Sequence, residues 1–203
     1  MRRRKASTRI ALLIALTSIA LLTCTAIALA LTSFGTIQIP YRVTPVEVER
    51  SCVYVLTDRN YYHSIINDLR RANNSICVVM YSMIYDPEDP FDWANDLIRE
   101  LVNARKRGVD VKVVIEYRTY YGYMSDNLKA YEYLSSSGVS AKLDQEADTD
   151  HLKLVVIDGK IVYVGSHNWS ESALYYNRET SVKIVSEEVA RQFLEYLNSN
   201  YGL

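Results

Sequence analysis

The pattern of hydrophobic and polar positions predicts strands and helices that alternate along the chain from residue 52 onward. Short apolar runs rich in β-branched residues predict strands, and segments with apolar residues at helical spacing predict helices between them. The predicted strands cover residues 52–56, 75–85, 109–117, 140–143, 151–157, 160–164 and 180–185. The predicted helices cover residues 61–72, 91–107, 125–136, 170–174 and 187–198. Repeated β–α units that end in a hairpin indicate an α/β fold, with helices flanking a mixed, largely parallel sheet.

A different pattern precedes these units, because residues 10–31 contain no charged residue and are rich in Leu, Ile and Ala. At roughly 1.5 Å per residue this segment is long enough to cross a hydrocarbon core of about 30 Å. We therefore predict a basic tail at 1–9, a transmembrane signal anchor at 10–31, a linker at 32–46 and a catalytic domain at 47–203.

Five of the six basic residues within positions 1–46 lie on the N-terminal side of this apolar segment, and the sixth is Arg42. The positive-inside rule then leaves the N-terminus in the cytoplasm and places the domain outside it. A cleaved signal peptide, which would release a secreted domain, is the alternative, since Ala28 and Ala30 fit a small-residue cleavage site. The length of the apolar run favours the uncleaved anchor.

Composition and charge narrow the class of protein. With 49% hydrophobic and 23% charged residues the chain is typical of globular proteins, which excludes a disordered one. Residues 47–203 carry 17 of the 23 basic residues and all 24 acidic residues. A net acidic domain has no general attraction for nucleic acid, so local charges must hold any anionic substrate.

Candidate chemistry is concentrated around the predicted hairpin. His151 and Lys153 are two residues apart in a strand and therefore share a face. Asp158 and Gly159 predict a two-residue turn, which sets Ile157 opposite Lys160, Lys153 opposite Val164 and His151 opposite Ser166. In this register a histidine, a lysine and a hydroxyl meet at one spot, and the amide of Asn168 follows just beyond.

The spacing of these residues follows the pattern H-x-K-x4-D-x6-G-S-x-N without a departure. Six specified types at fixed offsets arise by chance roughly once in 10^7 positions, if each type has a frequency of about 7%. The pattern resembles the HKD motif of the phospholipase D superfamily. The chain is most similar to the small single-motif members, the metal-independent bacterial endonuclease type, in which an asparagine and a glutamate follow the motif. The matching residues are His151, Lys153, Asp158, Gly165, Ser166 and Asn168, followed by Asn177 and Glu179.

The resemblance implies a mechanism that needs no metal and no cofactor. His151 would attack phosphorus to give a phosphohistidine, and Glu179 would accept the proton of its other ring nitrogen. Lys153 would neutralise the phosphate oxygens, with Ser166 and Asn168 as further donors. Asp158, which falls in the predicted turn, is assigned with Gly159 and Gly165 to structure.

Such a two-step reaction also needs a second histidine, and the chain has no second H-x-K. We interpret His63 as an ordinary surface or core residue, while His167 is either substrate-lining or turned to the opposite face from Ser166. The second histidine must then come from another subunit. A homodimer with a shared active site is therefore expected.

Several points stay open. The compact single-motif build favours an endonuclease on DNA or RNA, the membrane anchor favours a phospholipase D or cardiolipin hydrolase, and an inactive binding module is a remote third reading. Cys52 and Cys77 either form a disulfide or remain free thiols. The tyrosines of the loop at 117–123 either contact substrate or pack as ordinary amphipathic rings.

Overall fold

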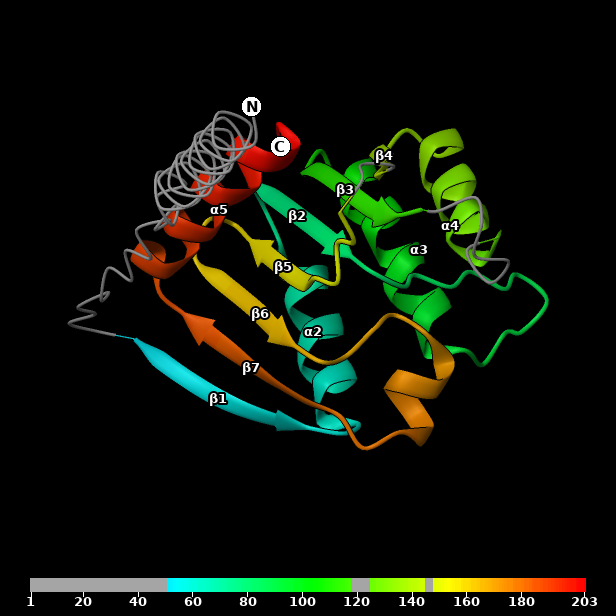
Figure 1. The fold of residues 1–203 in the computed structure, drawn as a ribbon, viewed down its shortest axis with the longest axis horizontal. Helices are drawn as coiled ribbons and strands as arrows, with labels where there is room; N and C mark the ends of the chain where they lie inside the picture. The colour runs from blue at the N-terminus through cyan, green and yellow to red at the C-terminus, as the bar shows by residue number, and fades with distance from the viewer. Residues whose placement is uncertain (1–50, 118–124, 145–147) are drawn as a thin grey trace, which may run out of the picture. The chain divides into compact units, whose positions relative to one another are not determined.

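The computed structural model describes residues 51–117, 125–144 and 148–203 (Figure 1). The predicted tail, anchor and linker, and all of the tyrosine-rich loop except Tyr117, lie outside these ranges. Within the described ranges, no helix combines the length and apolar character that crossing a membrane requires.

Strands and helices alternate as the hydrophobic pattern predicts, and most boundaries agree within two residues. The strands are β1 Cys52–Thr57, β2 Ser75–Met80, β3 Asp110–Glu116, β4 Ser140–Asp144, β5 Lys153–Ile157, β6 Ile161–Gly165 and β7 Thr180–Val185. The helices are α2 Asn60–Arg71, α3 Trp93–Lys106, α4 Ser125–Ser136, the π-helix η2 Ser172–Tyr176 and α5 Glu187–Tyr201. The main difference is β2, which ends at Met80 rather than at residue 85.

The strands form one seven-stranded sheet in the order β1-β7-β6-β5-β2-β3-β4. Only the pairs β2–β3 and β3–β4 are parallel, and the other four pairs are antiparallel. The sheet is thus mixed as predicted, but the prediction that it is largely parallel was wrong. Helical crossovers make the first pairs parallel. A tight turn joins β5 to β6, and a longer connection that contains η2 joins β6 to β7; both of these pairs are antiparallel.

Helices cover both faces of this sheet. In Figure 1, α2 and α3 lie behind the strands, and α5 lies in front of β5 and β6. Alternate residues of one strand supply the two cores: Val78 and Met80 pack with the α2, α3 and α4 side, while Cys77 and Val79 pack with α5. Cys77 is a buried free thiol and Cys52 is an exposed one, so the structure holds no disulfide between them.

The β5–β6 hairpin differs from the predicted register by one residue. Asp158 and Gly159 have positive φ angles of 52° and 60°, and the Lys160 N–H donates to the Ile157 carbonyl at 3.0 Å. Pairing nevertheless resumes with Ile157 opposite Ile161. Lys160 is left as an extra residue, because its carbonyl accepts the Ser186 N–H at 2.8 Å instead of joining the ladder.

This shift corrects the other predicted pairs as well. Val164 lies opposite Leu154 rather than Lys153. His151 comes before the first residue of β5 and Ser166 comes after the last residue of β6, so the two are not ladder partners.

Candidate active site

Apart from Asp158 and Gly159, the motif residues lie where one end of β5 meets the ends of β2, β6 and β7. Met80, the last residue of β2, pairs with Lys153, and Gly165, the last residue of β6, pairs with Ser181 in β7. This last approach is very close: a Cβ at Gly165 would lie 2.4 Å from the Ser181 Cα and 2.5 Å from the Thr180 carbonyl oxygen. Glycine is therefore required here for steric reasons, and it brings the loops after β6 and before β7 together.

Lys153 and His151 form the centre of the site. The Lys153 Nζ lies 3.1 Å from Nδ1 and 3.2 Å from Nε2 of the His151 ring, and it donates to the His151 carbonyl at 3.1 Å. The ring of Tyr81 packs on both groups, 4.7 Å from the lysine nitrogen and 4.4 Å from the imidazole centroid. The lysine is buried while the histidine is exposed, so an incoming phosphate can reach the ring.

The surroundings of these two groups shift both pKa values downward. Burial lowers the pKa of Lys153 to about 8, and the negative charge of Glu179 opposes this shift. Partial burial and then the charge of Lys153 hold the pKa of His151 below its ordinary value. Near pH 7 the imidazole is therefore neutral, which a nucleophile needs, while most of the lysine keeps its charge.

Glu179 lies on the β7 side of the same site. Its carboxylate accepts hydrogen bonds from the Ser166 hydroxyl and, at 3.1 Å, from the Asn177 side chain. The Ser166 oxygen in turn accepts the Thr180 N–H at 3.0 Å. Among the described residues the hydrogen-bond partner of the His151 ring is Lys153, so the role of Glu179 in orienting the histidine stays a prediction.

Asn168 adds a polar group without a partner. Its Oδ1 is buried and, within the described part of the chain, forms no hydrogen bond. A buried polar atom left unpaired costs free energy, and each such atom in a folded protein calls for an explanation, such as a catalytic role or a bound water or ion. The role of Asn168 in binding phosphate stays a prediction.

Asp158 and Gly159 lie at the opposite end of β5 from His151. The Asp158 carboxylate accepts the N–H groups of Asn74 at 2.7 Å and Ser75 at 3.0 Å, and that of Asn73 at 3.1 Å. These bonds attach the hairpin turn to the start of β2, far from the reacting groups.

The two other histidines do not enter the site. His167 is fully buried, stacks on Tyr61 with centroids 4.4 Å apart, and has both ring nitrogens engaged, by the Ser181 hydroxyl at 2.7 Å and the Asp58 carbonyl at 2.9 Å. His63 lies exposed on α2. Neither can serve as the second histidine of the same chain.

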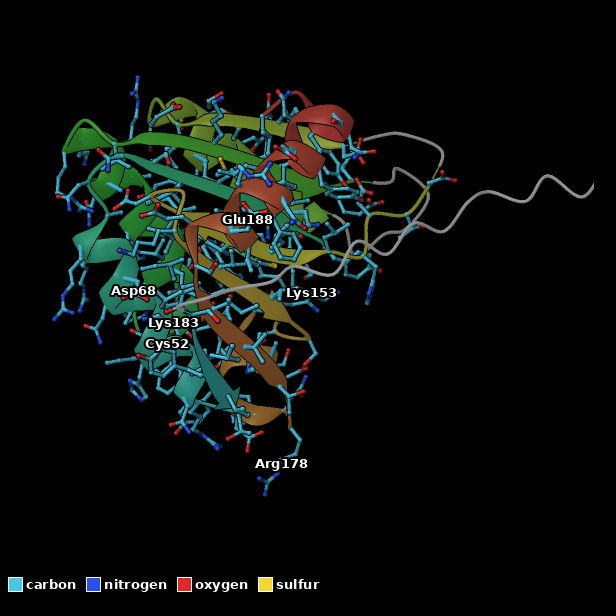
Figure 2. The ribbon with its side chains drawn as sticks, turned by 90° about the vertical axis from the view of Figure 1, so that its left-hand side faces the viewer. Cys52, Asp68, Lys153, Arg178, Lys183 and Glu188 are labelled. Carbon is cyan, nitrogen blue, oxygen red and sulfur yellow. The ribbon has the colours of Figure 1, made fainter. Side chains whose placement is uncertain are left out.

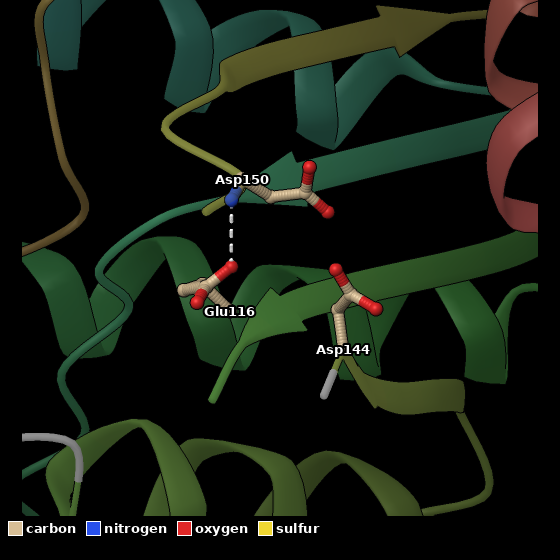
Figure 3. Close-up of side chains that lie close together, drawn as sticks. All are labelled: Glu116, Asp144 and Asp150. Atoms are coloured by element: carbon tan, nitrogen blue, oxygen red, sulfur yellow. Dashed lines mark hydrogen bonds between the residues drawn. The ribbon is translucent and has the colours of Figure 1, made fainter. Parts of the chain in front are cut away.

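Beside the site lies a cluster that the sequence did not indicate. Glu116 ends β3, Asp144 ends β4 and Asp150 directly precedes His151, and one carboxylate oxygen of each lies within 4.8 Å of the others (Figure 3). The Glu116 carboxylate accepts the Asp150 N–H at 2.8 Å. Burial and the adjacent Asp144 raise the pKa of Asp150 to about 7. Carboxylates are suitable ligands for a hard cation, but close packing also lets them share a proton.

Only the long-range topology brings these three carboxylates together. The observed strands β3 and β4 are parallel neighbours that each end in an acidic residue, whereas the strands predicted from the sequence were bounded at residues 117 and 143 and were not paired with each other. The expectation of chemistry without a metal stays a prediction.

Comparison with known proteins agrees with this geometry. The family model described as cardiolipin synthase, PLD-like domain, matches residues 65–201. The chain is 34% identical over 125 residues to the mitochondrial cardiolipin hydrolase of Canis lupus familiaris, covering 62% of this chain and 43% of that protein. It is 29% identical over 132 residues to a phospholipase D of Rickettsia typhi, covering 64% and 58% of the two chains.

A solved structure supports the same assignment. Nuc from Salmonella typhimurium, a phospholipase D family member, superposes with a TM-score of 0.64 at 29% identity. The match covers 75% of this chain and 95% of Nuc. The chain spans less than half the length of the canine relative, so the similarity extends to a domain rather than to that whole protein.

Proposed function

Because the chain belongs to the family of phospholipase D-like domains, we propose that it hydrolyses phosphodiesters through a covalent phosphohistidine on His151. The observation that carries the proposal is the Lys153 ammonium group, 3.1 Å from the exposed His151 ring in a motif of matching spacing. A cation beside a neutral imidazole is the arrangement that draws a phosphate onto a nucleophile.

The reaction proceeds in two displacements. In the first, a His151 nitrogen forms a bond to phosphorus while the bond from phosphorus to the leaving oxygen breaks, and that oxygen takes a proton. In the second, water attacks phosphorus, loses a proton, and displaces the imidazole. The charge on the phosphoryl oxygens is neutralised by Lys153 and by donors from Ser166 and Asn168. Glu179 accepts the proton on the second nitrogen of His151 and so stabilises the phosphohistidine.

The proton donor of the first step and the acceptor of the second are the same group on another subunit. His63 and His167 are unsuited to this role, since one is on the surface of α2 and the other is fully engaged in the core. We therefore assign it to the partner subunit's His151 in a symmetric homodimer. The unpaired Asn168 oxygen supports a site that is completed by a ligand or by a second chain.

We favour DNA or RNA as substrate, with phospholipid as the alternative. The compact single-motif domain and its similarity to Nuc support a nuclease. The similarity to proteins named cardiolipin hydrolase and the predicted anchor support a membrane phospholipid. In either case the anchor would hold the domain at a membrane, on the side away from the cytoplasm.

Substrate and intermediate can be tested in one set of assays. The full chain, purified in detergent, is incubated with single-stranded DNA, RNA, phosphatidylcholine or cardiolipin. It is denatured during turnover, and mass spectrometry is used to look for an acid-labile adduct on His151, a phosphoryl group that still carries one ester of the substrate. Cleavage of nucleic acid with a labelled His151 is expected. Turnover that continues in His151→Ala, or a label on another residue, would refute the phosphohistidine, while cleavage of lipid alone would replace only the substrate.

A further inference from the structure

A hollow lined by aromatic rings lies between η2 and the beginning of α3, apart from the motif residues. It encloses about 320 Å³. Its lining residues are Phe91, Trp93, Glu171, Tyr175 and Tyr176. Four of these five side chains are aromatic and the fifth is a carboxylate.

Neighbouring rings that line the hollow have nearly perpendicular planes. Trp93 and Tyr175 have centroids 5.0 Å apart and planes at 82°, and Tyr175 and Tyr176 have centroids 4.9 Å apart and planes at 81°. The ring of Tyr62 stacks on Trp93 with centroids 4.3 Å apart. The Tyr62 hydroxyl donates to the Asp96 carboxylate at 2.9 Å, which fixes the position of the Tyr62 ring. The hollow is thus formed in advance of any ligand.

Its outer rings are exposed to a degree that packing does not explain. Phe91 is 86% exposed and Tyr176 is 65% exposed, although both are large and apolar in their bodies. Adjacent exposed aromatic side chains commonly mark a surface that meets a ligand.

The charge around the hollow determines what kind of ligand fits. Glu171 forms part of the wall, and Asp92, whose carboxylate caps α3, lies within electrostatic reach of it. Burial first, and then the charges of Glu171, Asp89 and Asp86, raise the pKa of Asp92 to about 6, so several carboxylates lie near this corner. A phosphate or nucleotide would be repelled, whereas a cation is attracted both by the carboxylates and by the faces of the rings.

A cation already lies against one of these rings. The Arg59 guanidinium carbon lies 5.1 Å from the centroid of Tyr175, although Arg59 does not line the hollow. We propose that the hollow itself binds a quaternary ammonium group. Such a group donates no hydrogen bond, so it suits walls made of ring faces and one carboxylate better than a primary ammonium does. This binding site does not depend on the proposed hydrolysis.

The full chain in detergent provides a direct binding test with tetramethylammonium chloride. Of the two tryptophans Trp93 lines the hollow and Trp169 is fully buried, so a change in fluorescence reports on the hollow. We expect saturable binding that sodium chloride at equal ionic strength does not reproduce. No saturation would overturn the proposal.

Substitutions then locate the site. Tyr176→Ala and Glu171→Gln should each weaken binding by roughly three- to thirtyfold, the range of one cation–π or charge contact. Tyr175→Phe should keep the affinity, and Tyr196→Ala, which removes a 46% exposed tyrosine from α5, is the matched control. Equal affinity in Tyr176→Ala, Glu171→Gln and the control would refute the assignment to this hollow.

A final variant separates a cation site from a site for a stacked nucleobase. Arg59→Gln removes a like charge, so it should strengthen tetramethylammonium binding and weaken any binding of a mononucleotide. The reverse result would overturn the proposal. Competition by free choline or by phosphatidylcholine vesicles, with phosphatidylglycerol vesicles as control, then distinguishes a soluble ligand from a lipid headgroup, and either source supports the site.

Discussion

The two halves of the sheet differ in both construction and content. The parallel half, β2 to β4, is built by helical crossovers, and β2 and β3 are buried along most of their length. The antiparallel half consists of β5 to β7 with β1, and only β5 and β6 are joined by a tight turn. Its edge strand β1 leaves Val53 and Val55 59% and 74% exposed. His151, Lys153, Ser166 and Glu179 all come from the antiparallel half.

The parallel half supplies the support, and the antiparallel half supplies the residues of the site. The parallel half fixes β2, and β2 fixes β5 through the Met80–Lys153 pair and the bonds from residues 73–75 to Asp158. In Figure 2 Lys153 is labelled beside the strands, whereas Arg178 lies at the lower edge of the domain, with a side chain that is 93% exposed and forms an ion pair with Asp58 at 2.9 Å. Lys153 is thus held by its pairing with the buried strand β2, and the ring of Tyr81 packs on it and on His151.

Removing the nucleophile should have the largest effect. His151→Ala is expected to reduce turnover by on the order of 10^3-fold or more, because no other described histidine can replace it. Its exposed ring contributes little to packing, so the thermal midpoint should change little. His63→Ala, an exposed histidine on α2, is the control that keeps full activity. A His151→Ala protein with substantial turnover would show that the chemistry lies elsewhere.

Detaching the hairpin from β2 should affect stability instead. Asp158→Ala removes the acceptor of several backbone N–H groups and should lower the free energy of unfolding by about 1–3 kcal/mol in urea titrations. Because Asp158 also has a positive φ, Asp158→Asn distinguishes lost charge from backbone strain. Lys160→Ala, in the same turn, is the control. Reduced turnover in fully folded Asp158→Ala would contradict a purely structural role.

The pH dependence tests the site cation. Lys153 must be protonated to neutralise phosphate, and its pKa is lowered to about 8, so kcat/KM should fall roughly tenfold per pH unit above about pH 8. The acidic limb should lie below the ordinary histidine pKa, because that of His151 is lowered. Lys153→Arg, which stays charged, should lose the alkaline limb even if its rate is lower. An unchanged limb in that variant would assign it to another group.

Subunit mixing gives a smaller but more specific effect. With equal amounts of wild type and His151→Ala, random exchange leaves about a quarter of dimers with two wild-type chains. If each site needs both histidines, activity per wild-type chain should fall to about half. Activity strictly proportional to wild-type content despite proven exchange, or full activity in a monomer, would rule out the shared site.

Chelation is expected to change nothing. The proposed steps use nitrogen, hydroxyl and amide groups, so turnover should survive excess EDTA. Loss of activity with recovery on adding magnesium would contradict the metal-free steps and would indicate a metal bound by Glu116, Asp144 and Asp150. Glu116→Gln would then be the variant to compare.

Local features were predictable from the sequence, and long-range pairing was less so. Helix α4 was predicted at its observed bounds, and family membership followed from the motif. The hairpin register failed at Lys160, because the turn residues were recognised but the bond from Ser186 to the Lys160 carbonyl was not. The prediction that the sheet is largely parallel also failed, although the β5–β6 hairpin is antiparallel as predicted. A sequence pattern gives strands but not their neighbours.

Sites assembled from distant segments were not visible either. The acidic cluster joins Glu116, Asp144 and Asp150 across three strand ends, and the aromatic hollow joins residues 91–93 to residues 171–176. The sequence directed attention to the tyrosines of residues 117–123, which are adjacent in the chain. The tyrosines of η2 are distant from Trp93 in the chain but lie beside it in space, because η2 packs against α3.

The close approach at Gly165 has a consequence for how tolerance to mutation would be distributed along the chain. Any side chain there would force β6 and β7 apart and so separate Ser166 from Glu179. An activity screen of random variants would therefore score Gly165 alongside the nucleophile, although it supplies no atom to the reaction. The loss of activity at this position would come from a wider separation of two strands. A structural probe of the folded variants would be needed to distinguish this cause from a direct role in the reaction.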